Sequence, residues 1–180
     1  MIRSRRYSRG FTLIELMIVV AIVAVLALLG VAGYRRIIRT SHSAEARQMI
    51  GAIKIAQEQR RAETGSYASP SPGITGAANF CPTGAGLSQK FAWNPGCLNW
   101  SVLPVQSDGP VLFRYASVAG AAGAAPPALN IQGQNVIWPA PTVNDWFVTV
   151  AEVDENGDGT FCRLAGSSFT NEIWVENEGD

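Results

Sequence analysis

The feature that most constrains this chain is a long apolar run that follows a basic N-terminal leader. Between Phe11 and Gly33 the only ionisable side chain is Glu15. At about 1.5 Å per residue, a helix of this length reaches roughly 34 Å, which exceeds the hydrocarbon thickness of a bilayer, about 30 Å. The run is therefore predicted to be a membrane-spanning helix.

Glu15 is the exceptional residue within this run. An ionised carboxylate in a helix within hydrocarbon costs about 2.5 to 3.5 kcal/mol at the helix centre and less nearer the interface. A cation placed beside the carboxylate would offset this cost, so Glu15 is predicted to acquire a partner. The alternative is a glutamate that snorkels to the membrane surface or stays protonated.

A small residue, Gly10, separates the leader from the apolar run. A secretory signal carries its small-residue cleavage site after a shorter apolar region, whereas cleavage after Gly10 leaves the helix on the mature protein. Basic residues lie on both sides of the run: Arg3, Arg5, Arg6 and Arg9 before it, and Arg35, Arg36 and Arg39 after it. Because both sides are basic, the positive-inside bias favours a cytoplasmic N-terminus only weakly.

Residues 1–34, with Gly-Phe-Thr-Leu-Ile-Glu at positions 10–15, resemble the type IV pilin superfamily, which includes pilins, minor pilins and the pseudopilins of type II secretion. The resemblance implies that a prepilin peptidase cuts between Gly10 and Phe11 and methylates the new amine of Phe11. It also implies a precursor in the bacterial inner membrane, with its N-terminus in the cytoplasm and its C-terminal domain exported. The surface pilus would follow after assembly.

Cleavage creates the cation that Glu15 lacks. The free amine of Phe11 is positive near neutral pH, so Glu15 of a neighbouring subunit can pair with it and set the axial register of packed subunits. The expected partners are other pilin subunits, the prepilin peptidase, the inner-membrane pilus or secretion machinery and, before assembly, the lipid bilayer.

After the span, the apolar periodicity becomes that of an amphipathic helix. The predicted buried stripe consists of Ala46, Met49, Ile50, Ile53 and Ala56. Gly65 is a suitable helix stop, which predicts one helix from Phe11 to about Thr64. The predicted division of the chain is a leader at 1–10, an apolar helix at 11–33, its amphipathic continuation at 34–64 and a globular exported domain at 65–180.

The exported domain is predicted to hold a small antiparallel sheet. Residues 66–97 are rich in Ser, Pro, Gly and Ala and are predicted to form a loop. Strands are predicted from alternation at 98–103, 111–118 and 145–153, with a turn at Asp108-Gly109, a short edge element at 131–137 and further strands at 161–164 and 172–175. The expected fold class is α+β: a long N-terminal helix packed on four or five strands between about 98 and 176.

The formal net charge of zero hides an asymmetry along the chain. After Arg61 and Glu63 there remain three basic and ten acidic residues, which makes the exported domain acidic, with a net charge of about −7. Duplex binding depends on cationic neutralisation of phosphates, so a nonspecific nucleic-acid surface is not expected on one subunit. A local basic patch built by several subunits stays open.

All three cysteines follow the membrane span, where an envelope or extracellular setting permits disulfides. At most one intramolecular bridge can form. A bond between Cys81 and Cys97 is favoured, because it would staple the loop before the sheet; Cys97 to Cys162 is the alternative, since both could lie on neighbouring strands. The spacings match no zinc motif.

An acidic segment after the predicted strand 145–153 resembles the first half of a calcium loop, with oxygen side chains at Asp154, Asn156, Asp158 and Thr160. The pattern then fails, because Ala165 stands where an EF-hand needs a glutamate, although Glu172 or Glu176 could approach in space. A hairpin turn with Asn-Gly and Asp-Gly chemistry is favoured over calcium. No other cofactor is predicted.

An enzyme is not predicted, because no nucleophile motif accompanies His42, the only histidine. Three other functions fit these patterns. The favoured function is a structural subunit, pilin or minor pilin, of a type IV pilus, associated with adhesion or motility. The alternatives are a pseudopilin of type II secretion and a membrane-anchored adhesin or binding protein that uses Trp93, Trp100 and Trp138.

Overall fold

The structure is a computed structural model of the 180-residue chain, and it describes residues 11–84 and 88–178. Within these ranges only the backbone is described at Ala32, Arg35, Arg36, Arg39 and Thr40. The chain forms two compact units, residues 1–38 and 39–180. We call the second the head unit. The helix α1 (Leu13–Thr64) has residues in both units, and each unit is described by itself.

The long helix predicted from periodicity is confirmed. Its first helical residue is Leu13, two residues after the predicted start, and its last is Thr64. Gly65 ends it with a positive φ of 84° and donates its N–H to the carbonyl of Arg61 at 2.8 Å. Glycine carries no Cβ penalty in this left-handed cap conformation. The predicted apolar stripe is buried: Ala46, Met49, Ile50, Ile53 and Ala56.

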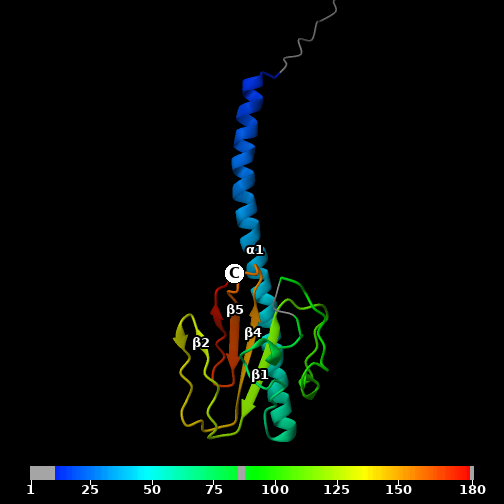
Figure 1. Cartoon of the computed structure of the whole chain (residues 1–180), viewed down its shortest axis with the longest axis vertical. Helices are drawn as coiled ribbons and strands as arrows, with labels where there is room; N and C mark the ends of the chain where they lie inside the picture. The colour runs from blue at the N-terminus through cyan, green and yellow to red at the C-terminus, as the bar shows by residue number, and fades with distance from the viewer. Residues whose placement is uncertain (1–10, 85–87, 179–180) are drawn as a thin grey trace, which may run out of the picture. The chain divides into compact units, whose positions relative to one another are not determined.

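The head unit contains the predicted antiparallel sheet, which confirms the α+β fold class (Figure 1). Its four strands are β1 (Arg114–Gly120), β4 (Trp146–Val153), β5 (Cys162–Ser167) and β6 (Trp174–Glu176). They pair in the order β1-β4-β5-β6, and all three pairings are antiparallel. The consecutive strands β4, β5 and β6 form a meander. β6 is one edge of the sheet, and β1, which pairs with β4, is the other.

The prediction of a strand at 98–103 is wrong. These residues form a 3₁₀ turn at Trp100–Val102. Leu98 has a positive φ of 51°, which takes the backbone out of the extended region. Trp100 in the turn and Leu103 just after it are both buried in the same core cluster. Alternation of apolar residues in a six-residue window is satisfied by such a turn as well as by a strand. The loop predicted at 66–97 contains a second 3₁₀ turn, Ala77–Asn79.

Two further element boundaries differ from the prediction. The segment at 131–137 is not an edge of the main sheet: β2 (Asn130–Ile131) and β3 (Gln134–Asn135) form their own two-stranded hairpin. Gln132 and Gly133 at its turn both have positive φ, as a type I′ hairpin turn requires. The strand predicted at 111–118 begins only at Arg114, and Val111 makes an isolated bridge with Phe91. Because residues 98–103 form no strand and β1 begins only at Arg114, the Asp108-Gly109 segment does not connect two strands.

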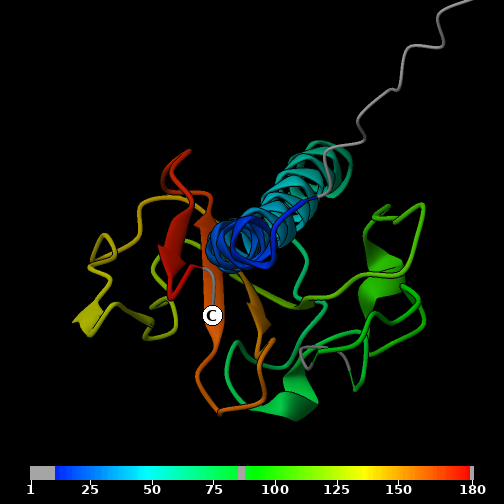
Figure 2. The ribbon, with the colours of Figure 1, turned by 90° about the horizontal axis from the view of Figure 1, so that it is seen from above.

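The sheet is covered on both faces. Tyr115, Ala151 and Leu164 face α1 and share a core with its buried stripe. Alternate residues on the other face, among them Ala116 and Val150, pack beneath connecting segments. The covering residues are Ile74, Phe80, Leu129 and Ile131. Figure 2 shows residues 39–64 of α1 and these connections around the sheet, and β4 is buried along its whole length.

Close packing between α1 and the sheet depends on Gly166 of β5. A Cβ at Gly166 would lie 2.7 Å from Cγ2 of Ile50. We therefore expect Gly166→Val to lower the free energy of unfolding by about 1 to 3 kcal/mol, because an overpacked core must shift side chains or backbone. Chemical unfolding followed by tryptophan fluorescence measures this. Gly51→Ala is the matched control, since its Cβ meets nothing within 4 Å; equal losses in both variants would contradict the packing argument.

A ladder of alternating charges crosses the sheet, with one residue from each strand. Arg114, Glu152, Arg163 and Glu176 are successive cross-strand partners. The carboxylate of Glu152 accepts from Nε of Arg114 at 2.9 Å and from Nε of Arg163 at 3.0 Å, and Glu152 is only 4% exposed. Opposite charges on directly paired residues stabilise strand register. We call these four residues the charge ladder.

Candidate assembly site

The N-terminal part of α1 presents an apolar surface that none of the described residues covers. Leu13–Val31 has a mean hydropathy of 3.0, none of it is buried, and it is the one segment of the described residues long and apolar enough to span a membrane. Phe11 just before it is 85% exposed. Such a surface in water would be an aggregation site, and its length and composition suit cover by lipid or by other helices.

Glu15 lies in the first turn of α1 and forms a capping box with Thr12. The carboxylate oxygen Oε2 of Glu15 accepts from the backbone N–H and from the hydroxyl of Thr12, both at 2.8 Å. In return, the Thr12 hydroxyl accepts from the N–H of Glu15 at 3.2 Å. The first N–H groups of a helix lack partners within the helix, and this reciprocal arrangement satisfies two of them.

The capping box gives Glu15 a local role that the sequence analysis missed. The signal was present, because Thr-x-x-Glu before an apolar run is the pattern of a capping box. A carboxylate is also stabilised at a helix N-terminus by the helix dipole. Glu15 is therefore oriented within its own chain, and the acceptor it presents lies next to the backbone of Thr12 and close in sequence to Phe11.

Removal of the Thr12 hydroxyl tests the capping box. We expect Thr12→Val to destabilise the first turn of α1 by about 1 kcal/mol, the usual effect of losing an N-cap hydroxyl. Amide hydrogen exchange of the first turn, measured in detergent micelles, should then be about fivefold faster. Thr12→Ser keeps the hydroxyl and should exchange like the unsubstituted chain; equally fast exchange in the serine variant would contradict this role.

Gly10 and the leader arginines, predicted to take part in processing and orientation, lie outside the described residues. Cleavage between Gly10 and Phe11 thus stays a prediction. The pairing of Glu15 with a neighbouring Phe11 also stays a prediction, since a single chain is described.

The structure contains a disulfide between Cys81 and Cys97, with a Cα–Cα distance of 6.0 Å. Cys81 is also joined to β1, because its N–H donates to the carbonyl of Tyr115 at 2.9 Å. The bond therefore fastens the loop that precedes Cys97 to the edge of the sheet. Cys162 is buried in β5 and is not part of the disulfide, so the alternative pairing with Cys97 is not the one formed.

The disulfide should contribute measurably to stability. Its cysteines are 16 residues apart, and closing a loop of that size in the unfolded chain is worth about 3 kcal/mol in the chain-entropy model. Cys97→Ser is expected to lower the free energy of unfolding by about this amount in urea titrations under oxidising conditions. A reducing agent should lower the stability of the unsubstituted chain and leave the variant unchanged; a variant as stable as the oxidised parent would refute the estimate.

The acidic segment after β4 is held by its own hydrogen bonds. Asp154 accepts from the N–H groups of Gly157 at 2.7 Å and Gly159 at 3.0 Å, which makes the turn. The N–H of Thr160 donates to Asp158 and keeps the pKa of that carboxyl below its usual range. Among the described residues no group of three or more His, Cys, Asp or Glu side chains is arranged to hold a metal ion. A calcium role for Asp154, Asn156, Asp158 and Thr160 has no further support here.

The histidine and the tryptophans named in the sequence analysis contact other residues of the head unit. Nδ1 of His42 lies 3.1 Å from Oε2 of Glu155, so the histidine pairs α1 with the turn after β4. Trp100 is completely buried, and the ring of Trp93 packs edge-on against it at 5.1 Å. The indole N–H of Trp138 donates to the carbonyl of Pro127 at 2.8 Å. Trp100 is thus a core residue rather than a contact for a partner.

Two comparisons with known proteins found a similarity. The family model of the prokaryotic N-terminal methylation motif matches residues 5–31. Type IV major fimbrial protein FimA of Dichelobacter nodosus is 38% identical over 91 residues, which cover 49% of this chain and 56% of that protein. The chain thus spans little more than half the length of this curated relative. No solved structure matches the chain.

Proposed function

We infer that this type IV pilin-like chain is a structural subunit, pilin or minor pilin, of a type IV pilus. The observation that supports this most is the uncovered apolar helix Leu13–Val31, which carries one oriented carboxylate in its first turn. A helix of this kind can lie in a bilayer before assembly and among the helices of other subunits afterwards. The methylation motif over residues 5–31 and the similarity to a fimbrial protein support the same function.

The proposed assembly contact joins Glu15 to the amine of Phe11 in a neighbouring subunit. Cleavage after Gly10 frees this amine, and α-amino groups are largely protonated near neutral pH. Because Oε2 of Glu15 takes both Thr12 donors, Oε1 is the oxygen proposed to receive the neighbouring amine. A charge-assisted bond in an apolar surrounding is short and directional, so it fixes how far one subunit is displaced along its neighbour.

The proposed division of the chain follows from this mechanism. Residues 1–10 are a leader that a prepilin peptidase removes, and 11–33 insert in the inner membrane and later form the filament core. Residues 34–64 continue the helix, and 65–180 form the exported domain. The N-terminus of the precursor lies in the cytoplasm, and the inner-membrane assembly machinery is the further partner.

The second candidate is a pseudopilin of type II secretion, which would use the same N-terminal helix. The similarity to a major fimbrial protein favours the pilus. A membrane-anchored adhesin is less favoured, because Trp100 is buried and Trp138 is bound to a loop carbonyl.

Intact mass and N-terminal sequence of the chain from sheared surface filaments test the proposal. A chain that begins at N-methylated Phe11 in the sheared fraction is expected. The same processed chain found only in the envelope would favour the pseudopilin. An uncleaved chain that begins at Met1 would overturn the pilin mechanism and leave a membrane-anchored domain.

A further inference from the structure

We propose that Asn156, in the turn after β4, is a site of spontaneous deamidation, and that the carboxylate of Asp154 slows this reaction by holding the N–H of Gly157. The modification needs only water, so the inference does not depend on what the chain assembles with. It gives the acidic segment after β4 a role other than the calcium binding considered from the sequence.

The sequence distinguishes Asn156 from the other asparagines, because it is the one asparagine that a glycine follows. Deamidation begins when the backbone nitrogen of the next residue attacks the side-chain amide carbon. A Cβ on that next residue crowds the attack. Gly157 has no Cβ and lies at a positive φ of 77°, and both residues are exposed to water.

Water is the only co-reactant of this modification. The nitrogen of Gly157 loses its proton to solvent and forms a bond to Cγ of Asn156, while the bond between Cγ and Nδ2 breaks and ammonia leaves. The product of this step is a five-membered succinimide ring. Water then opens the ring at either of its two carbonyls, which leaves an aspartate or a β-linked isoaspartate at position 156.

Asp154 opposes the first step of the reaction. Its Oδ1 accepts from the N–H of Gly157 at 2.7 Å, and its Oδ2 accepts from the N–H of Gly159 at 3.0 Å. Asp154 is only 4% exposed, so its charge is weakly screened. Removal of the Gly157 proton would place a second negative charge beside this carboxylate, and a like charge disfavours the charged form. The Gly157 nitrogen is therefore a poor nucleophile while the turn is intact.

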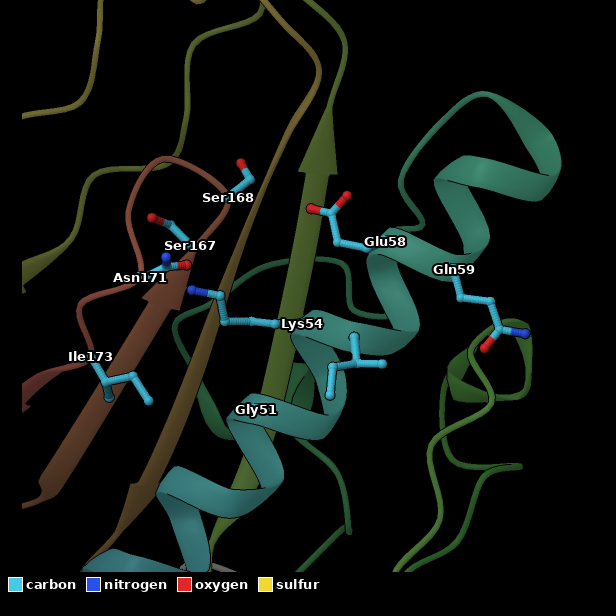
Figure 3. Close-up of a pocket in the computed structure, with 9 residues that line it drawn as sticks. Gly51, Lys54, Glu58, Gln59, Ser167, Ser168, Asn171 and Ile173 are labelled. Atoms are coloured by element: carbon cyan, nitrogen blue, oxygen red, sulfur yellow. The ribbon is translucent and has the colours of Figure 1, made fainter.

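Asn171 serves as an internal comparison for the role of the following residue. It lies at the groove between α1 and the β5–β6 connection (Figure 3) and is exposed, as Asn156 is. Glu172 follows it, so a Cβ crowds the attacking nitrogen. Asn171 should therefore stay intact under conditions that convert Asn156, which would show that exposure alone does not cause the reaction.

Deamidation would disrupt the turn in which it occurs. In the intact turn, Nδ2 of Asn156 donates to Oδ2 of Asp158 at 2.9 Å, and Oδ1 of Asn156 accepts from the N–H of Asp158 at 2.9 Å. A carboxylate at position 156 has no proton to donate and would repel the carboxylate of Asp158. The neighbouring Glu155 lies 3.1 Å from His42 of α1, so a change in this turn also affects its contact with the helix.

Timed deamidation of the purified full chain tests the inference. The folded chain in detergent is incubated in mildly alkaline buffer, and peptide mapping by mass spectrometry follows the conversion of each asparagine. We expect Asp154→Ser to convert Asn156 about tenfold faster than the unsubstituted chain does, because the Gly157 N–H loses its bond to a charged acceptor. Serine keeps a hydroxyl oxygen as an acceptor but carries no charge.

Asp158→Ser is the matched control for this measurement. Asp158 lies in the same turn and bonds to Asn156 and Thr160, whereas the N–H of Gly157 donates to Asp154. Asp158→Ser should therefore accelerate the conversion of Asn156 much less than Asp154→Ser does. Equal acceleration in the two variants would show that loosening of the turn, and not the Asp154 carboxylate, sets the rate.

The unfolded chain supplies the rate without protection. In concentrated urea the bond between Asp154 and Gly157 is absent, so Asn156 should be converted faster than in the folded chain. Conversion of the folded chain at the unfolded rate would overturn the inference, as would a folded Asp154→Ser variant that is no faster than its parent. If Asp154→Ser does not fold, Asp154→Asn takes its place, because it keeps the shape of the side chain without the charge, and fragment spectra distinguish the two asparagines.

Discussion

Glu15→Ala is expected to abolish incorporation of the chain into filaments, while the processed protein remains in the membrane. In the proposed assembly contact, loss of the carboxylate would leave the neighbouring Phe11 amine without its partner in an apolar surrounding. Removing one member of a buried charged pair costs about 3 kcal/mol or more, which corresponds to about a hundredfold per contact. Immunoblots of sheared filaments and of membranes measure both fractions.

Glu15→Gln separates the two roles of this side chain. A glutamine at this position can still complete the capping box with Thr12, but it carries no charge. If charge pairing drives assembly, Glu15→Gln fails as Glu15→Ala does. Filaments from the glutamine variant, with none from the alanine variant, would show that capping is sufficient and that the Phe11 pairing is not the mechanism.

Glu152→Ala is expected to lower the free energy of unfolding of the head unit by about 3 to 5 kcal/mol. The substitution removes the acceptor of both Arg114 and Arg163, and the side chain of Arg114 is only 13% exposed. A buried cation without its partner is costly, which makes this loss larger than that of an ordinary surface pair. Urea unfolding of the full chain in detergent, followed by tryptophan fluorescence, measures it, because all five tryptophans lie in the head unit.

Glu178→Ala is the matched control for this measurement. Glu178 pairs with Arg47 at 3.4 Å, and both side chains are more than 40% exposed. Exposed ion pairs contribute at most about 1 kcal/mol. A loss in Glu152→Ala as small as that in Glu178→Ala would show that the charge ladder does not stabilise the sheet.

The helix and the later strands were predictable because their signals are local. The apolar stripe from Ala46 to Ala56 has a helical period, and Gly65 supplies the backbone conformation that ends the helix. Residues 145–153 were predicted as a strand, and β4 covers Trp146–Val153. The short window 98–103 failed because alternation over six residues does not distinguish a strand from a turn that buries Trp100.

The candidate site was predictable only in part. Glu15 was identified from the free-energy cost of placing a carboxylate in hydrocarbon. Its hydrogen bond with Thr12 was seen only in the geometry of the first helical turn. Sequence reasoning favoured the Cys81–Cys97 bond and left Cys162 as an alternative partner, and the structure contains the first pairing. The charge ladder was missed altogether, because its members are brought side by side only by strand register.

The sequence by itself determined the division of this protein into an apolar N-terminal helix and an acidic C-terminal part, because hydropathy, periodicity and charge act within one segment. Only the tertiary structure decided which distant residues meet, such as Arg114 with Glu152 and Gly166 with Ile50. Such contacts depend on strand register and on packing between elements. Many pairings are compatible with the same local patterns, and only the folded core selects one of them.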